Sequence, residues 1–264
     1  MIALIDIDSL FYHASYMLDD PSNVEKLGLS DEDEDTIIGS LAEIAMDRTE
    51  KMLNEILLDI EQDEHNIYIH AKELYVTTAQ NNIRKQIDET YKANRKKNQV
   101  IDKVVSCLRS LYIVKENAIS DDVYEADDII ADRARELGIG NFIVVSMDKD
   151  LKQIGGFFYD FYKKPSKKDD EGNIIEEYPR RGLSYISSLD AKKMLGRQLI
   201  MGDSGDNVGG LPKYGKKKAS EIIDHLETEF GVKRAVIETY KKVYGDAYID
   251  PLMLNFRLLY LGKL

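Results

Sequence analysis

Two short apolar runs, each ending in aspartates, constrain the fold of this chain most strongly. The first is IALIDI at residues 2–7, which contains Asp6 and is followed by Asp8; the second is FIVVS at residues 142–146, followed by Asp148 and Asp150. Such runs are typical of strands that are buried on both faces of a sheet. Because helical patterns lie between them, we predict an α/β protein with a mostly parallel central sheet flanked by helices.

The remaining pattern places the other elements around these runs. Helices are expected where apolar residues recur at helical spacing: residues 9–17, 36–60, 104–113, 126–137 and most of 189–264. Further strands are expected at residues 74–78 and 157–162, with a weaker β-rich piece at 66–69. Two polar stretches read as loops: residues 19–35, and residues 163–177, a hairpin tip turning at Gly172 and Asn173.

The composition favours a cytoplasmic protein that does not coat nucleic acid by bulk charge. No apolar run approaches the roughly 20 residues that span a bilayer, and the N-terminus MIALIDID is too short and acidic for a signal peptide. A single cysteine, Cys107, excludes an internal disulfide framework. The net charge of −12 argues against wholesale electrostatic binding to DNA, although clustered lysines can still grip it locally.

The acidic residues converge on one edge of the predicted sheet, where ligands bind in parallel α/β folds. The candidates are Asp6, Glu125, Asp127, Asp128, Asp148, Asp150, Asp203 and Asp206. So many carboxylates close together repel one another unless cations are present, and oxygen-only ligands favour Mg²⁺ or Mn²⁺. Each motif alone has a simpler reading: YEADD as a charged helix start, SMDKD as a turn. Their combination predicts two divalent ions, about 4 Å apart, suited to phosphodiester cleavage.

Two basic stretches complete the pattern. Residues 81–102 are polar and strongly basic, which predicts a protruding loop or arch and not a core element. The segment GGLPKYGKKKAS at residues 209–220 is typical of a helix-turn-helix whose backbone N–H groups and lysines hold phosphates. A charged loop is usually just a solvated surface, but its place between two metal motifs favours function here.

The motifs IDIDSLF, TYKANRK, YEADD, SMDKDL, MGDSGDN and GLPKYGKKKA together resemble the phage and bacterial 5′-nuclease (flap endonuclease) family over nearly the whole chain. The resemblance implies a PIN-like nuclease core at residues 1–188 with a basic arch at about 80–103, and a helical DNA-binding region at 189–264 with its helix-turn-helix at about 207–226. It implies a monomeric 5′–3′ exonuclease and flap endonuclease in DNA replication and primer removal. The expected partners are branched or 5′-ended duplex DNA, RNA–DNA hybrids and replication proteins.

The resemblance also implies roles for individual residues. Asp6, Glu125 and Asp127 are expected toward one metal, and Asp148, Asp150 and Asp206 toward the other, while Asp128 and Asp203 act partly through water. Lys92 and Arg95 are the expected catalytic cations on the scissile phosphate. The expected DNA contacts are Arg84, Tyr91, Lys96, Gly210, Lys213, Gly215, Lys216, Lys217 and Lys218. For Tyr91, packing within the fold is an equal alternative to stacking on an unpaired base. A K⁺ ion is sometimes held in such a helix-turn-helix.

One departure from the family pattern leaves alternatives open. Ala79 stands where the family carries an aspartate before the arch, and Asp8 stands where it carries a small or polar residue. Ala79 makes a DNA-junction-binding protein with weakened catalysis one alternative. The other is a haloacid-dehalogenase-type phosphatase, in which Asp6 is the nucleophile and Asp8 the general acid; it leaves YEADD, SMDKDL and the basic arch unexplained.

Overall fold

A five-stranded sheet forms the centre of the fold in the computed structural model, which describes residues 1–16, 18, 20–29, 32–163, 167–168, 174–176 and 180–263. Its strands are β1 (Ile2–Asp6), β2 (Ala71–Tyr75), β3 (Phe142–Val145), β4 (Gly156–Lys163) and β7 (Arg180–Ile186). Their order is β2-β1-β3-β4-β7, and only β7 runs antiparallel to its neighbour. The predicted α/β fold with a mostly parallel sheet is confirmed.

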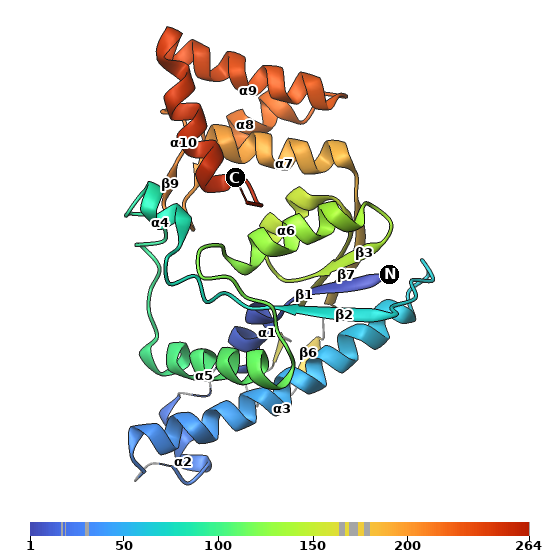
Figure 1. The fold of residues 1–264 in the computed structure, drawn as a ribbon, viewed down its shortest axis with the longest axis vertical. Helices are drawn as coiled ribbons and strands as arrows, with labels where there is room; N and C mark the ends of the chain where they lie inside the picture. The colour runs from blue at the N-terminus through green and yellow to red at the C-terminus, as the bar shows by residue number, and fades with distance from the viewer. Residues whose placement is uncertain are drawn as a thin grey trace.

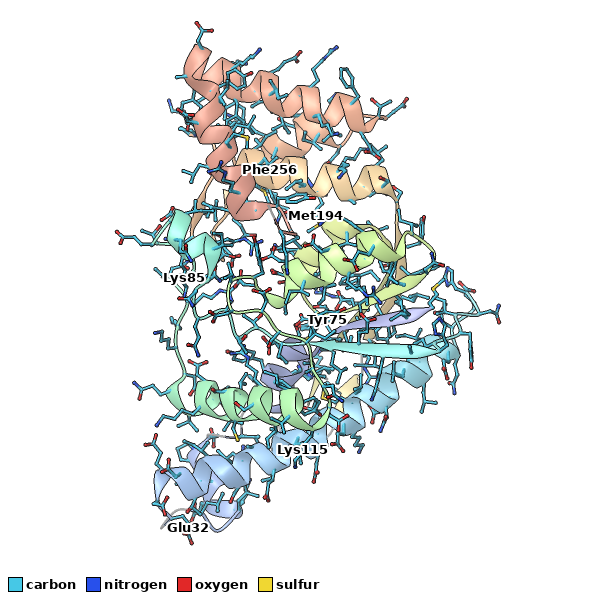
Figure 2. The ribbon with its side chains drawn as sticks, viewed as in Figure 1. Glu32, Tyr75, Lys85, Lys115, Met194 and Phe256 are labelled. Carbon is cyan, nitrogen blue, oxygen red and sulfur yellow. The ribbon has the colours of Figure 1, made fainter. Side chains whose placement is uncertain are left out.

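Helices cover both faces of this sheet (Figure 1). On one face, β1 packs against three helices: α1 (Ile7–Ala14), α3 (Glu34–Glu61) and α5 (Gln99–Lys115). On the other face lie α6 (Ala126–Leu137) and the short 3₁₀ helix η1 (Lys149–Ile154). The alternation of β1 explains both cores, because Ala3 and Ile5 face α1, α3 and α5, whereas Leu4 faces α6. Tyr75, at the end of β2, fills the core beneath α6 (Figure 2).

Several local predictions were wrong. The stretch at residues 19–35 contains a short helix, α2 (Pro21–Lys26), because Asp20 caps it and Pro21 takes its first position. The strand expected at 74–78 lies earlier, as β2, and residues 66–69 form no strand. The strand β7 was not expected, since its half-buried residues give no clear alternation. A hairpin does form at β5 (Lys167–Lys168) and β6 (Ile174–Glu176), but its expected turn at Gly172 and Asn173 lies outside the described residues.

The C-terminal part is mainly helical and has an apolar core of its own. It comprises α7 (Ser188–Met201), α8 (Lys216–Ile223), α9 (Glu229–Tyr244), the 3₁₀ turn η2 (Gly245–Tyr248) and α10 (Ile249–Leu259), with the two-residue strands β8 (Gly202–Asp203) and β9 (Val208–Gly209) between α7 and α8. Phe256 packs against this core (Figure 2). Residues 207–226, the expected range of the helix-turn-helix, contain β9 and one helix, α8. The helix-turn-helix assignment and the division at residue 188 stay predictions. Within the described residues, no helix is long and apolar enough to cross a membrane.

The basic segment differs from the protruding arch that was expected. Its first half forms α4 (Ile83–Ile87), which lies beside α10 (Figure 1), and a turn that is hydrogen-bonded to the residues between β8 and β9. Ile87 packs against the C-terminal core and Tyr91 lies within it. Backbone and side-chain hydrogen bonds fix the turn further: Lys92 N donates to Asp206 O at 2.9 Å, and Asn207 Nδ2 donates to Thr90 O at 2.9 Å. Only residues 93–99 are continuously exposed, so the projecting part is shorter than predicted.

Candidate metal centre and nucleic-acid interface

A cluster of three carboxylates occupies the N-terminus of α6. Glu125 is the N-cap residue of this helix and Asp127 and Asp128 belong to its first turn, so backbone geometry alone brings them together. Oxygen atoms of the three side chains lie within 4.8 Å of one another. The positive end of the helix dipole favours the charges, but it is too weak to balance three clustered carboxylates, two of which are buried.

Arg84 from α4 supplies one countercharge. Its guanidinium donates to both oxygens of Asp128, at 2.7 and 2.5 Å, and to Glu125 Oε2 at 2.9 Å. Asp128 also accepts from the backbone N–H groups of Gly262 and Glu125, at 2.9 and 3.3 Å. Asp128 is therefore fully engaged and buried, which suits the indirect metal role expected for it.

Asp127 is different, because one of its oxygens has no partner. Asp127 Oδ1 is buried and makes no hydrogen bond, and Arg84 Nη1 lies 3.9 Å away. Burial and the charges of Asp128 and Glu125 raise the pKa of Asp127 well above its usual value. A buried carboxylate oxygen without a donor is costly unless a cation binds it. The all-oxygen donor set therefore fits a hard divalent ion such as Mg²⁺ or Mn²⁺.

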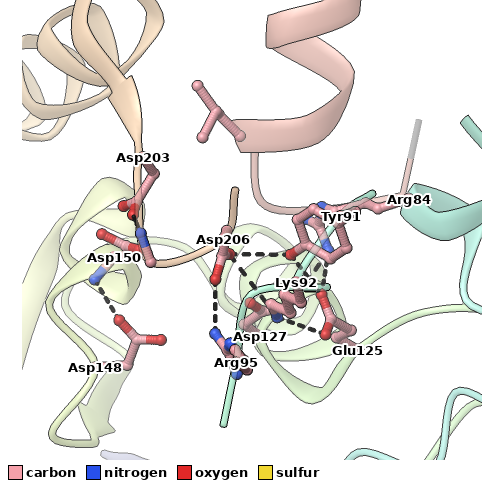
Figure 3. Close-up of polar contacts among 12 residues, drawn as sticks. Arg84, Tyr91, Lys92, Arg95, Glu125, Asp127, Asp148, Asp150, Asp203 and Asp206 are labelled. Atoms are coloured by element: carbon pink, nitrogen blue, oxygen red, sulfur yellow. Dashed lines mark hydrogen bonds and ion pairs between the residues drawn. The ribbon is translucent and has the colours of Figure 1, made fainter. Parts of the chain in front are cut away.

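The turn after α4 brings further charges to the cluster (Figure 3). Lys92 Nζ lies 2.6 Å from Glu125 Oε1 and 3.9 Å from Asp206 Oδ2. Burial tends to lower the pKa of Lys92, but the carboxylates of Glu125, Asp127 and Asp206 outweigh burial and raise it, so the ammonium stays charged. Tyr91 Oη donates to Glu125 Oε2 at 2.9 Å and to Asp206 Oδ2 at 3.1 Å, and Arg95 Nη2 donates to Asp206 Oδ1 at 2.6 Å.

A second acidic group lies at the end of β3 and in the β8–β9 turn. Lys149 Nζ bridges Asp150 Oδ1 at 2.9 Å and Asp203 Oδ2 at 3.3 Å, and Gln198 Nε2 donates to Asp150 Oδ1 at 2.8 Å. Burial and the neighbouring charge of Asp148 raise the pKa of Asp150 to about 6. These residues line a cavity of about 790 Å³, whose wall also includes Arg95, Arg197, Asp206 and Lys216.

Asp6 and Asp8 follow one another at the end of β1 but have different surroundings. Asp6 Oδ2 accepts from the hydroxyls of Ser9 and Ser146, the latter at 2.6 Å. Burial and the charges of Asp8 and Asp148 raise the pKa of Asp6 to about 6 despite these hydrogen bonds. Asp8 instead forms a bidentate ion pair with Arg109, at 2.9 Å for each contact.

The metal-free contacts group Asp203 and Asp206 with different carboxylates, and the expected division of metal ligands stays a prediction. Asp206 is joined by Lys92, Arg95 and Tyr91 to the α6 cluster (Figure 3). Asp203 instead lies with Asp150 through Lys149. Asp203 also accepts a hydrogen bond from Gly205 N at 2.8 Å, within the turn that joins β8 to β9.

Two expected DNA contacts are buried. Arg84 is 2% exposed and Tyr91 is 3% exposed, so in this conformation neither can touch a duplex. The basic segment was expected to be exposed, but the carboxylate and carbonyl partners of the Arg84 and Tyr91 side chains lie 34 to 176 positions away along the chain. Gly210 packs closely against the backbone of Met201 and Gly202. The remaining expected contacts are exposed: Lys96, Lys213, Gly215, Lys216, Lys217 and Lys218.

Sequence reasoning missed four polar residues that hold the carboxylates. Ser9 and Ser146 bind Asp6, while Lys149 and Gln198 bind Asp150. Two carried a usable signal: Ser9 lies one helical turn after Asp6, and Lys149 separates two aspartates in SMDKD. Ser146 and Gln198 had none, because their contacts come from the packing of distant elements.

Comparison with known proteins identifies the class of this chain. Residues 1–178 match the family described as 5′-3′ exonuclease, N-terminal resolvase-like domain. The match covers more than half of the chain, and the chain belongs to this family.

Curated relatives agree with this placement, and a solved structure shares the fold. The chain is 31% identical to DNA polymerase I of Rhizobium leguminosarum over 184 residues, which cover 68% of the chain but 17% of that protein. It is 29% identical to the flap endonuclease Xni of Shewanella sediminis over 147 residues, 53% of each chain. It thus spans only part of the length of these relatives. Zinc-bound T5 5′-exonuclease shares the fold with a TM-score of 0.55 at 16% identity, covering 98% of this chain and 87% of that one.

Proposed function

We propose that this chain is a metal-dependent 5′ nuclease that hydrolyses phosphodiesters of branched or 5′-ended duplex DNA, as a 5′–3′ exonuclease and flap endonuclease. The observation that carries the proposal is the buried Asp127 oxygen without a donor, in a three-carboxylate cluster beside Lys92. Family membership supports the reaction class. Work on primer ends during replication is the setting we infer for it.

Two groups of residues would hold divalent ions. Asp6, Glu125 and Asp127 are proposed for one, and Asp148, Asp150 and Asp206 for the other, with Asp128 and Asp203 acting through water. Such ions activate water and stabilise the leaving oxygen. We infer that Asp206 lies within reach of both ions, because Lys92 and Arg95 hold its carboxylate near Glu125 when no metal is bound. Whether K⁺ binds in the helix-turn-helix stays a prediction.

The positively charged residues around the cluster would bind the scissile phosphate, support the carboxylates or bind the duplex. Lys92 and Arg95 can move from carboxylates to the phosphate being cut, because both lie where the segment turns toward solvent. Arg84 is buried against Asp128 and we assign it to holding the cluster. The exposed lysines at the start of α8 are proposed to hold the duplex at a distance from the cut.

A cleavage assay on a 5′-flap duplex tests the function. Product is expected with Mg²⁺ or Mn²⁺ and none with EDTA. Asp127→Asn should abolish product, whereas Asp132→Asn, on the same helix but paired with Arg135, should leave it unchanged. Absence of product even in Mn²⁺ would contradict the proposal.

A second candidate function is junction binding without efficient cleavage, which Ala79 favours because it lacks a carboxylate at the exit of β2. Ala79→Asp belongs in the same assay. Flap binding without product, together with cleavage by Ala79→Asp, would establish this candidate. The phosphatase reading loses support, since the bidentate pair with Arg109 engages the Asp8 that it needs as a free general acid.

A further inference from the structure

Asp8 has both carboxylate oxygens occupied by groups from two other elements. Oδ1 accepts from Arg109 Nε and Oδ2 from Arg109 Nη2, each at 2.9 Å, and Oδ2 also accepts from the backbone N–H of Thr77 at 2.9 Å. Asp8 lies in the first turn of α1, Arg109 in α5, and Thr77 two residues beyond β2. The side chain therefore joins α1, α5 and the exit of β2 at the carboxyl edge of the sheet.

Thr77 carries this connection to the acidic cluster. Its hydroxyl oxygen accepts from the backbone N–H of Ala126 at 3.0 Å, the first residue of α6. Glu125 and Asp127 flank Ala126 in the chain. A continuous path of hydrogen bonds thus runs from Arg109 through Asp8 and Thr77 to the helix end that holds the carboxylates.

The other end of the path leads toward the basic segment. Arg109 lies over the ring of Tyr12, 6.0 Å from its centroid, and Tyr12 Oη donates to Asp102 at 3.3 Å. Asp102 belongs to the first turn of α5, the helix that directly follows the segment carrying Lys92 and Arg95. Both contacts fix α1 against α5 at this end.

We propose that Asp8 and Arg109 form a positioning pair that sets the N-terminus of α6, and so the affinity of the acidic cluster for divalent metal. This inference rests on the metal site of the proposed function. The guanidinium takes both oxygens of Asp8, so the pair acts through Thr77 and not as a metal ligand. Outer residues that orient metal ligands typically change metal affinity by about 10- to 100-fold when altered.

The test measures Mn²⁺ affinity of the full chain by titration calorimetry without DNA. Asp8→Ala and Arg109→Ala should each raise the Mn²⁺ dissociation constant about tenfold or more. The double variant should bind Mn²⁺ no more weakly than either single variant, because both substitutions break the same path. Thr77→Val removes the acceptor of the Ala126 N–H group and should raise the Mn²⁺ dissociation constant in the same way. Thr77→Ser keeps the hydroxyl and should bind Mn²⁺ as tightly as the wild-type chain. Arg180→Ala is the matched control. Arg180 joins β7 to α3 through ion pairs with Glu55 and Asp59. Its side chain is 22% exposed, and that of Arg109 is 24% exposed.

Three outcomes would overturn the pair's role. Melting temperatures that fall while Mn²⁺ affinity, measured well below melting, stays at the wild-type value would mean that the pair only stabilises the fold. Weaker binding in Asp8→Ala with stronger binding in Arg109→Ala would make Asp8 a metal ligand. Equal weakening in Arg180→Ala would make the effect general. The result is separable from the proposed function, since Mn²⁺ binding can depend on the pair even if flap DNA is not cut.

Discussion

Lys92 Nζ and Glu125 Oε1 lie 2.6 Å apart, at the point where the basic segment meets the N-terminus of α6. The ammonium also lies 4.9 Å from the centre of the Tyr91 ring, and the backbone N–H of Lys92 donates to Asp206 O. A fixed backbone with a charged side-chain tip allows this cation to change partners without moving the segment. Under the proposed function, Lys92 would turn from Glu125 to a phosphate oxygen of the substrate once a bound metal ion offset the charge of Glu125.

Lys92→Ala should reduce turnover much more than duplex affinity. Loss of a preorganised positive charge on a developing oxyanion typically costs about 10²- to 10³-fold in rate, while one cation contributes little to a duplex interface held elsewhere. Single-turnover cleavage and equilibrium binding to the same flap measure the two effects. Lys97→Ala, an exposed lysine of the same segment, is the control. Equal losses in rate and affinity would count against a catalytic role.

Lys216 and Lys217 should instead govern duplex affinity. Both are exposed in the first turn of α8. If each neutralises one phosphate, the double Lys216→Ala/Lys217→Ala variant should reduce the slope of log affinity against log salt by about two. Binding to a blunt duplex over a salt series measures it, and Lys233→Ala/Lys242→Ala in α9 is the matched control. An unchanged slope would mean that the α8 lysines face solvent in the complex.

Asp6 should make the metal-free protein less stable as the pH rises. Its pKa of about 6 lies above its ordinary value of 3.8, so the folded chain holds this proton more tightly than the unfolded chain. The contribution is complete below about pH 4 and lost as the pH rises through about 6, a change of about 3 kcal/mol. Unfolding in EDTA at several pH values should therefore show Asp6→Asn gaining stability relative to wild type across this range. Parallel pH profiles of the two proteins would contradict this expectation.

The parts of this fold that the sequence predicted well are those with local causes. Apolar runs bounded by aspartates defined β1 and β3, and chain order then placed Asp6, Asp148 and Asp150 at one edge of the sheet. Arg84 shows the limit, because nothing near it in sequence indicates burial. Its partner Asp128 lies 44 residues away, and the carbonyl of Tyr260, which it also contacts, lies 176 residues away. Such contacts depend on how the C-terminal helices pack against α4, which periodicity does not contain.

Gly210 gives a prediction that joins this packing to the DNA-binding lysines. A Cβ atom at Gly210 would lie 2.1 Å from the carbonyl carbon of Met201 and 2.5 Å from Gly202 N, whereas a Cβ at Gly209 would meet nothing within 4 Å. Those neighbours are backbone atoms between α7 and β8, so they cannot rotate away. Gly210→Ala should therefore lower the free energy of unfolding by about 3 kcal/mol or more, and Gly209→Ala by less than about 1 kcal/mol.

The same variant should weaken duplex binding at temperatures where it is still folded. The chain continues toward Lys213 and the first turn of α8 directly after the antiparallel pairing of β8 with β9. If the Gly210→Ala variant separates these segments, the lysines no longer present one surface, and the salt slope should decrease together with affinity. Chemical denaturation and duplex titration on both glycine variants measure the two effects. A Gly210→Ala protein that matched Gly209→Ala in both would show that this close approach is not needed to orient α8.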